Sequence, residues 1–510
     1  MKNKVYANAS IVTGLSVAER ALGFLYRIVL SRFIGAEGLG IYQVALSLFG
    51  LFITIGTGGL PITVSRFITK SKAENQPRGE SGTVGGGIFL CLLLTLPVAV
   101  FLFIFGGKLP FLFTDNRAFQ VFRILLLGLC FSSVYAVIRG HFWGNKDFFA
   151  PSVLELAEEA VMVIVGVLLL QRVSSPANGA EKAAWAVVIS YLFSSSLSLL
   201  WFFIRGGKIT SPRGMLKPLF QASAPITAVR ASGSLVNSAV AVLLPVMLIR
   251  AGINESEALK LFGVVSGMVL PILFIPSTVI GSLALVLVPE LSEDFYRRNF
   301  TRLRVNLARG LKISFLFACC LIPFFFALGE NLGRLAYSNA LAGTMIKNSC
   351  LLLLPMSLTM ISTSMLNAIG YEKQTFIFYF VGAAAMLLCI LFLPPFCGVY
   401  AYIVGLGASF SLTAICNISF LFKQAPVYEN WGKSFLREYL PTLCFVPFLC
   451  VFGTVFHRFF TNFTGEILSI FATAGSLTAA TLLVCLLTGV FSLKTLVLPW
   501  KRKKKKLPLS

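Results

Sequence analysis

The chain has 510 residues, of which 57% are hydrophobic and only 12% are charged. Apolar runs of 18 residues or more recur along it, which excludes a soluble globular protein and predicts a polytopic membrane protein. The formal net charge of +23 would suggest nucleic-acid binding in a soluble protein. Here the Lys and Arg residues cluster between the apolar runs, as they do in the cytoplasmic loops of membrane proteins. We therefore expect no nucleic-acid partner.

The hydropathy pattern predicts about fourteen transmembrane helices and an all-α fold. The expected segments are residues 5–33, 40–68, 84–106, 118–143, 149–171, 183–204, 219–250, 259–290, 307–329, 347–369, 374–396, 399–423, 436–460 and 465–491. The first segment is long and has no small-residue cleavage site before its end, so we expect no cleavable signal peptide.

The Lys and Arg residues between the segments predict the orientation in the cell membrane. If the N-terminus is cytoplasmic, the links richest in Lys and Arg all fall on the cytoplasmic side, together with the basic tail Lys501–Lys506. Both termini are then cytoplasmic, as an even number of segments requires. The tail is expected to anchor the last helix and to contact anionic lipid.

The two halves of the chain resemble each other. The second segment begins Glu37-Gly-Leu-Gly-Ile-Tyr-Gln and the eighth begins Glu257-Ala-Leu-Lys-Leu-Phe-Gly. The fourth segment ends at Gly144 and the tenth at Gly370, each before a short polar turn. This order predicts two six-helix lobes in a pseudo-twofold arrangement, residues 1–217 and 218–425, followed by two helices and the tail in 426–510. Such repeats are typical of transporters, which bind their substrate between the repeats.

The first segment carries three ionisable residues, Glu19, Arg20 and Arg27. A charge at the bilayer centre costs about 2.5–3.5 kcal/mol unless it faces protein or water. Arg20 and Arg27 are seven residues apart, so they share nearly one helix face and lie about 10 Å apart along the axis. Two guanidinium groups on one face suit an anion such as phosphate or diphosphate. Alternatively, Glu19 and Arg20 form an interhelical salt bridge that only fixes packing.

Further ionisable residues lie in later segments. Glu155, Glu158 and Glu159 share one face of the fifth segment, where they could pair with arginines or exchange protons. Arg230 lies inside the seventh segment and either binds substrate or extends to the interface. Other basic residues lie near segment ends, where their side chains can reach the headgroup region; they are Arg66, Arg123, Arg139 and His141.

Helix breakers interrupt two segments. Gly59 and Pro61 lie in the second, and Pro271 and Pro276 lie in the eighth. Proline removes a backbone hydrogen bond and kinks a helix. These positions predict either static bends or hinges about which one helix bundle moves against the other.

No motif of a soluble enzyme is found: there is no P-loop, no HExxH and no GxSxG at a strand–helix turn. The eleven cysteines lie almost entirely in apolar segments, with no CxxC pair and no Cys/His cluster. We interpret them as small core residues. The sequence therefore predicts neither a metal site nor a cofactor, and a transporter rather than an enzyme.

Several motifs resemble a known family. They are Glu19-Arg-Ala-Leu-Gly-Phe-Leu-Tyr-Arg27, Gly59-Leu-Pro-Ile-Thr-Val-Ser-Arg66 and Gly267-Met-Val-Leu-Pro-Ile-Leu-Phe-Ile-Pro276. Together they resemble the stage V sporulation protein B family. This is a polysaccharide-biosynthesis branch of the flippase superfamily, which also contains the MurJ lipid II flippases, O-antigen flippases and multidrug exporters. The resemblance covers nearly the whole chain.

The resemblance implies two six-helix lobes around a central cavity, with segments 13 and 14 forming a groove for a lipid tail. It implies export of an undecaprenyl-diphosphate-linked peptidoglycan precursor, lipid II, for the spore cortex or the cell wall, with cell-wall synthesis enzymes as possible partners. It also implies that Arg20 binds the diphosphate, and extends this role to Arg27 and Arg230. Arg27 departs from the family pattern by one position, and the family's arginine inside the second segment is missing.

Three alternatives remain open at the level of sequence. One is a multidrug or cation antiporter, which should place acidic residues rather than arginines against its substrate. Another is an exporter of a different polysaccharide repeat unit. The third is an integral-membrane glycosyltransferase or polymerase, which the short outer links disfavour. The sequence does not identify the driving force, and a coupling ion would be H⁺ or Na⁺.

Overall fold

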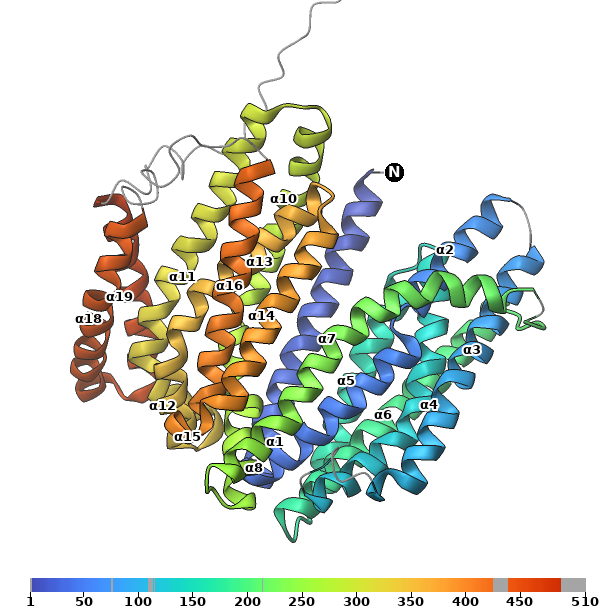
Figure 1. Ribbon diagram of the computed structural model, residues 1–510, viewed down its shortest axis with the longest axis horizontal. Helices are drawn as coiled ribbons and strands as arrows, with labels where there is room; N and C mark the ends of the chain where they lie inside the picture. Colours follow the sequence, from blue (N-terminus) through green and yellow to red (C-terminus); the bar gives the residue numbers. More distant parts are fainter. Residues whose placement is uncertain are drawn as a thin grey trace, which may run out of the picture. The chain divides into compact units, whose positions relative to one another are not determined.

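The computed structural model describes residues 2–74, 77–108, 113, 115–212, 214–424 and 439–487. Every regular element in these residues is a helix (Figure 1). Eleven helical stretches of the described chain are long and apolar enough to cross a membrane. The fold is therefore that of a multi-pass, all-helical membrane protein, as the sequence predicts. The count of fourteen segments stays a prediction, and the basic tail lies outside the described residues.

The chain forms two compact units. Of the described residues, unit 1 contains those up to Pro271 and Cys389–Tyr402, and unit 2 contains Ile272–Leu388 and those from Ile403 onward. The helices of unit 1 are α1 (Lys2–Thr57), α2 (Leu60–Ala73), α3 (Pro77–Phe105), η1 (Gly106–Lys108), α4 (Asn116–Gly144), α5 (Phe149–Leu170), α6 (Pro176–Ile204), α7 (Leu216–Arg250), α8 (Glu255–Gly263), the π-helix η2 (Val264–Val269) and α15 (Pro394–Cys397). The predicted lobe limits at residues 217 and 425 stay a prediction.

The helix α9 (Leu270–Phe274) contains the boundary between the units. The remaining helices belong mainly to unit 2. They are α10 (Ser277–Tyr296), α11 (Phe300–Tyr337), α12 (Ala340–Ser349), η3 (Cys350–Leu352), α13 (Leu353–Ala368), α14 (Glu372–Phe392), α16 (Tyr400–Gln424), α18 (Leu440–Thr464) and α19 (Glu466–Leu487).

A kink at Gly35 divides α1. Gly35 has φ 66° and ψ −175°, a conformation that costs glycine little and other residues much. The first two predicted segments lie on either side of this residue: the first lies in α1, and the second covers the end of α1 and most of α2. The glycine therefore separates the two segments without any loop between them.

The core of unit 1 lies among α2 to α7. Val64, Ile68, Val137 and Ile138 are fully buried there, together with Phe142 and Phe202. Small residues bring the helices close: a Cβ at Gly140 would lie 2.6 Å from the carbonyl oxygen of Pro61. Close helix approach at small residues is how helices pack in membranes, where apolar burial alone gives little driving force.

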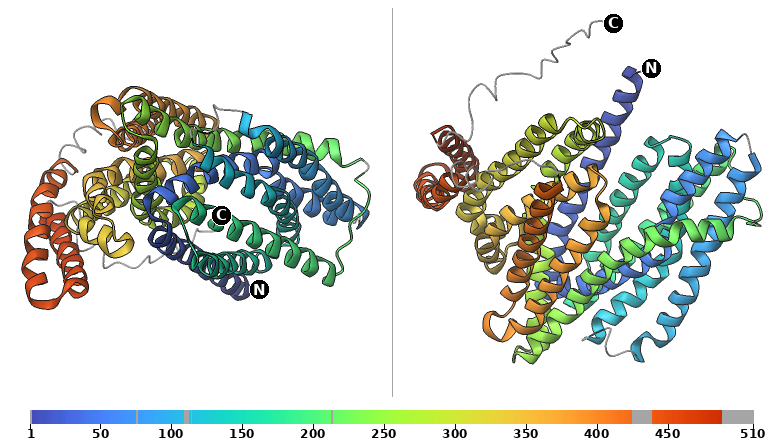
Figure 2. Two further views of the ribbon diagram at one scale, coloured as in Figure 1. Left: turned by 90° about the horizontal axis from the view of Figure 1, so that it is seen from below. Right: turned by 45° about the horizontal axis from the view of Figure 1, so that its top comes forward.

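The core of unit 2 lies among α10, α11, α13 and α16. The helices α18 and α19 pack against each other and against α11 (Figures 1 and 2). A Cβ at Gly453 of α18 would lie 2.9 Å from Leu477 of α19 and 3.0 Å from Ala327 of α11. The outward faces of α18 and α19 expose large apolar side chains, such as Phe448, Phe459 and Phe471, which suit contact with lipid.

Candidate functional site

The first half of α1 presents two arginines on one face. The helix runs without interruption from Lys2 to the kink at Gly35, so the seven-residue spacing of Arg20 and Arg27 is helical throughout. Both residues are exposed, whereas Glu19 is half-buried. Their predicted separation of about 10 Å along the axis follows from the helical rise. The two guanidinium groups are therefore accessible to a ligand.

The glutamates of α5 pack against this half of α1. A Cβ at Gly23 would lie 2.7 Å from Oε1 of Glu159, so glycine at this position makes room for the carboxylate. The charged neighbours of Glu159 are Glu19 and Arg27. Gly23 thus lets α5 bring an acidic side chain between Glu19 and Arg27.

Arg139 of α4 joins the same group. Its NH1 donates to Oε1 of Glu155 at 2.8 Å, and its guanidinium lies 5.1 Å from the ring of Trp143. Glu19 interacts electrostatically with both Glu155 and Arg139. Oε2 of Glu158 is buried and has no hydrogen-bond partner among the described residues. We call Glu19, Glu155, Glu158 and Glu159 with Arg139 the acidic cluster.

The acidic cluster differs in one respect from the expectation. Sequence placed Arg139 near a segment end, with its side chain directed to the interface, but the structure pairs it with Glu155. The sequence does contain an indication of this ion pair. The short turn between α4 and α5 makes them an antiparallel hairpin, and Arg139 and Glu155 lie at similar distances from that turn, so they face each other.

Arg230 makes no hydrogen bond or ion pair with these residues within the described part of the chain. It is exposed on α7, and no hydrogen bond or ion pair of its side chain is found within the described part of the chain. The polar contacts between α7 and α1 fall on the second half of α1: Thr54 Oγ1 lies 2.9 Å from Ser234 Oγ, and Ser238 donates to the carbonyl oxygen of Ser47. The structure brings Arg20 and Arg27 next to the acidic cluster, but records no contact of Arg230 with it.

Gly59 and Pro61 mark the break between α1 and α2. The backbone nitrogen of Gly59 donates to Oγ1 of Thr227 at 2.9 Å, and a Cβ at Gly59 would overlap the carbonyl oxygen of Ser223. Pro61 lies in the first turn of α2, where it needs no hydrogen-bond donor. The break is thus held closely against α7.

Pro271 lies in the first turn of α9, and Pro276 lies two residues after its end. The π-helix η2 ends two residues before Pro271, which is the last residue of the first stretch of unit 1, and Pro276 precedes α10. Wide helical turns are frequent at functional positions of helices. The predicted eighth segment therefore contains a helical run that continues to Phe274 and includes the π-helix η2, followed after a short break by the longer helix α10. Whether these positions act as hinges stays a prediction.

One end of unit 1 is closed by backbone contact. We call it the Gly35 end; here α1 bends, and α4 and α8 begin. A Cβ at Gly40 would overlap the carbonyl oxygen of Leu259, and one at Gly263 would lie 2.5 Å from the nitrogen of Gly40. The starts of the second and eighth predicted segments, which resemble each other in sequence, therefore meet directly.

A carboxylate secures the Gly35 end. Oε1 of Glu37 accepts hydrogen bonds from Ser256 Oγ and from NH1 of Arg117, both at 2.8 Å. Arg117 also donates through Nε to Asp115 at 2.8 Å. The bond from Ser256 ties α1 to α8, and the bond from Arg117 ties α1 to α4.

Long apolar helices with ionisable groups placed inside them define a polytopic membrane protein. The chain belongs to the polysaccharide biosynthesis protein family, whose profile matches residues 5–295. No group of three or more His, Cys, Asp and Glu that could hold a metal ion occurs in the described residues.

Two curated relatives come from Bacillus subtilis. Stage V sporulation protein B is 24% identical over 66% of this chain and 67% of its own length. The lipid II flippase MurJ is 23% identical over 61% of this chain and 62% of its own length. The matches thus span about two thirds of each relative or less.

Solved structures share the fold. A lipid II flippase MurJ in an inward closed conformation superposes with a TM-score of 0.68 at 16% identity, over 94% of this chain and 98% of its own. An inward-facing multidrug resistance transporter of the MATE family gives 0.67 at 16% identity, over 80% and 94%. These likenesses concern the fold alone.

Proposed function

We propose that this protein is a flippase that exports a lipid-linked oligosaccharide, and that its substrate is lipid II, an undecaprenyl-diphosphate-linked peptidoglycan precursor. The observation that carries the proposal is the pair of exposed arginines on one face of α1, Arg20 and Arg27. Guanidinium groups bind phosphate oxygens in pairs, so two of them suit a diphosphate. The relatives named for sporulation and for lipid II transport favour a role in spore cortex or cell-wall synthesis.

In this proposal the diphosphate binds to Arg20 and Arg27, while the prenyl chain stays in lipid along α18 and α19. The acidic cluster offsets the positive charge of the empty site, because Glu159 interacts with Arg27 and Glu19 with Arg20. Arg230 is included on the strength of the resemblance, and it should contribute less, since it has no recorded contact with the acidic cluster. No covalent bond changes during transport.

Transport requires the site to face one side of the membrane at a time. The Gly35 end is closed by the contact of Gly40 with Leu259 and Gly263. Release at this end would require α8 to separate from α1, with loss of the bond between Ser256 and Glu37. The breaks at Gly59 and around Pro271 and Pro276 are where we expect the helices to bend. We further propose that the Gly35 end is extracellular and that both termini are cytoplasmic.

A second candidate function is export of cationic drugs, coupled to H⁺ or Na⁺. The acidic cluster favours it, because the cluster contains four carboxylates and one arginine, and one carboxylate oxygen of Glu158 is unpaired within the described residues. A cationic substrate would bind Glu158 and Glu159 rather than Arg20. The two functions therefore respond oppositely to changes at these residues.

The test is native mass spectrometry of the purified protein with three ligands: lipid II, an unrelated undecaprenyl-diphosphate glycan and a cationic dye. Arg20→Ala should weaken lipid II binding at least about tenfold, because a hydrogen bond to a charged group contributes about 1.5–3 kcal/mol. Arg20→Lys should keep part of the binding, since lysine cannot bind a diphosphate in the bidentate manner of arginine.

Arg250→Ala is the matched control, since Arg250 is exposed at the far end of α7. Full lipid II binding by Arg20→Ala would remove Arg20 from the site. Equal binding of both glycans would keep the flippase class but not the choice of lipid II. Binding of the dye alone, lost in Glu158→Gln, would favour the drug exporter.

A further inference from the structure

A polar pocket lies at the end of unit 1 opposite the Gly35 end. Here α2, α4 and α6 end and α3 and α5 begin, and we call it the His141 end. The pocket has a volume of about 460 Å³, within the range of small-ligand sites. Phe142 and Phe202 form its buried floor. Its charged and polar lining comes from Lys72, Glu80, Ser81, His141, Asn145, Asp147, Arg205 and Lys208.

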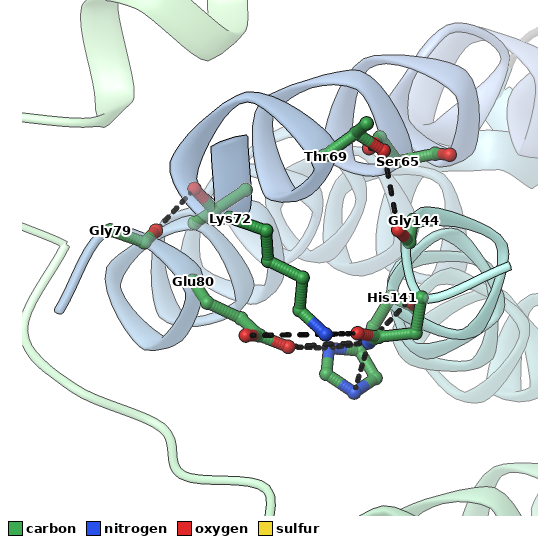
Figure 3. Close-up of polar contacts among 9 residues, drawn as sticks. Ser65, Thr69, Lys72, Gly79, Glu80, His141 and Gly144 are labelled. Atoms are coloured by element: carbon green, nitrogen blue, oxygen red, sulfur yellow. Dashed lines mark hydrogen bonds and ion pairs between the residues drawn. The ribbon is translucent and has the colours of Figure 1, made fainter. Parts of the chain in front are cut away.

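One group of polar side chains inside the pocket is fully connected. Lys72 from α2 and Glu80 from α3 extend toward His141 on α4 (Figure 3). Asn145 accepts a hydrogen bond from Lys72, and donates to Oε1 of Glu80 at 3.2 Å. Nδ1 of His141 lies 3.5 Å from the same carboxylate oxygen. Three helices thus bring one acidic side chain and one cation together in the pocket.

A second charged pair also lines the pocket. Arg205 at the end of α6 forms an ion pair with Asp147, and Asp147 also accepts a hydrogen bond from the backbone nitrogen of Ala150 at 3.1 Å. The guanidinium of Arg205 lies 5.1 Å from the ring of Trp201 and 5.8 Å from that of Phe142. Stacking and pairing together fix this cation at the pocket rim.

Lys208 is the third cation of the lining. The turn before it requires glycine twice: Gly206 has φ 78°, and a Cβ at Gly207 would lie 2.5 Å from the ring of Phe202. The chain after it is fixed to α3, since Thr210 and Ser81 pair through their hydroxyls at 3.1 Å. Within the described residues, no hydrogen bond or ion pair of Lys208 is found. The turn therefore holds an unpaired ammonium group at the pocket.

The charges of the lining do not cancel. Three cations, Lys72, Arg205 and Lys208, face two carboxylates, Glu80 and Asp147. With a neutral His141, the pocket has one excess positive charge, and the unpaired group is Lys208. A ligand with a single negative charge would neutralise it. A phosphodiester carries this charge and has oxygens to accept from all three cations.

The surroundings of the rim favour a lipid as the source of this phosphate. Phe203, Ile204 and Ile209, which flank Arg205 and Lys208, are 51%, 74% and 43% exposed. Large exposed apolar side chains beside cations at a helix end match the boundary between acyl chains and headgroups. The predicted orientation puts this end on the cytoplasmic side, where anionic lipids attract basic pockets between helices.

We propose that the pocket at the His141 end binds a phosphate group, and that an anionic phospholipid headgroup supplies it. Lys208 makes the new ion pair, while Lys72 and Arg205 share their charge between their acidic partners and the phosphate. The aromatic floor of Phe142 and Phe202 contacts the glycerol. This site is separate from the arginines on α1, so it does not depend on the transported substrate.

The experiment uses the purified, delipidated full-length protein and native mass spectrometry. Its probes are phosphatidylglycerol and phosphatidylethanolamine with identical acyl chains, and soluble glycerol 3-phosphate. We expect phosphatidylglycerol to bind about fivefold better than phosphatidylethanolamine, since one basic residue near anionic lipid contributes about 1 kcal/mol. Lys208→Glu should abolish this preference. Lys217→Glu, an equal charge change on an exposed lysine at the same end but outside the pocket, should keep it.

Each outcome is decisive. No preference for phosphatidylglycerol together with no binding of glycerol 3-phosphate would overturn the proposal, as would an equal loss in Lys208→Glu and Lys217→Glu. Binding of glycerol 3-phosphate that only Lys208→Glu removes would support the phosphate site and overturn the lipid as its source. Lipid II binding measured on the same Lys208→Glu sample should stay unchanged, which separates this test from that of the proposed function. The melting temperature of each variant reports whether it is folded.

Discussion

The two ends of unit 1 are held by different means. At the Gly35 end, α1 and α8 meet through the backbone atoms of Gly40, Leu259 and Gly263, with no space for a side chain between them. At the His141 end, the helices surround a pocket of about 460 Å³, and long polar side chains such as Lys72 and Glu80 bridge it. The Gly35 end is thus closed by direct backbone contact, whereas the helices at the His141 end are connected by side chains that cross a pocket.

This difference has a consequence for movement. A backbone contact between two glycines is either made or absent, because even one added methyl group would prevent it. Long polar side chains can exchange one partner for another or for water at little cost. We therefore expect the Gly35 end to have two distinct states, closed and open. At the His141 end, the polar side chains should instead rearrange gradually, as they must when a ligand enters the pocket.

Among the variants considered, Gly40→Ala is expected to reduce the stability of the protein most. Alanine normally stabilises a helix relative to glycine by about 0.5–1 kcal/mol, but here its methyl group would overlap the carbonyl oxygen of Leu259. We expect the free energy of unfolding to fall by about 1–3 kcal/mol, as at other overpacked sites, or α1 and α8 to stay separated at the Gly35 end. The control is Gly50→Ala in the same helix, where a Cβ would meet no atom within 4 Å. Thermal unfolding of both variants in detergent measures the difference; equal melting temperatures would contradict a closed contact at Gly40.

The second largest loss of stability, about 1 kcal/mol in the free energy of unfolding, is expected for Glu37→Ala. The variant removes two hydrogen bonds of 2.8 Å, from Ser256 and from Arg117. The loss stays moderate because Arg117 keeps Asp115 as a partner. Glu257→Ala is the control at the same end, since Glu257 makes only an exposed ion pair with Lys260 on its own helix, of about 0.3–0.5 kcal/mol. If both variants melt alike, Glu37 does not tie α1 to α8.

Much of the fold follows from the sequence, because hydrophobic runs report helices directly. The turns at Gly144 and Gly370 were likewise predicted from local residues: Gly144 is the last residue of α4, and Gly370 lies in the turn that follows α13. What the sequence could not show is how the helices meet. The contact of Gly40 with Gly263 joins residues remote in the chain, and nothing local distinguishes these glycines from Gly50.

The candidate site shows the same limit. The shared face of Glu155, Glu158 and Glu159 could be predicted from helical spacing, as could that of Arg20 and Arg27. Their mutual arrangement depends on Gly23, which admits Glu159 next to α1, and on Arg139, which pairs with Glu155. The π-helix η2 was also not predicted, because Pro271 indicates a kink but not the kind of helical turn before it.

At the His141 end, Asn145→Ala should have an effect of about 0.5–1 kcal/mol on stability. Asn145 links Lys72, Glu80 and the carbonyl oxygen of His141, but the pocket around it can admit water to replace the lost bonds. Asn116→Ala, at the exposed start of α4, is the control and should be neutral. A loss as large as that of Gly40→Ala would show that this end, too, is a rigid contact.

The smallest effect is expected for Lys72→Ala, below about 0.5 kcal/mol. Its side chain is 52% exposed and lies 4.0 Å from the carboxylate of Glu80, in the range of surface ion pairs that contribute little. Glu80 keeps Asn145 and His141 as neighbours when the lysine is removed. If Lys72 belongs to a binding pocket, the variant should melt at the same temperature as the unchanged protein and bind phosphatidylglycerol more weakly. A large fall in melting temperature would instead make Lys72 a structural counterpart of Arg117 at the opposite end, and the difference between the two ends would disappear.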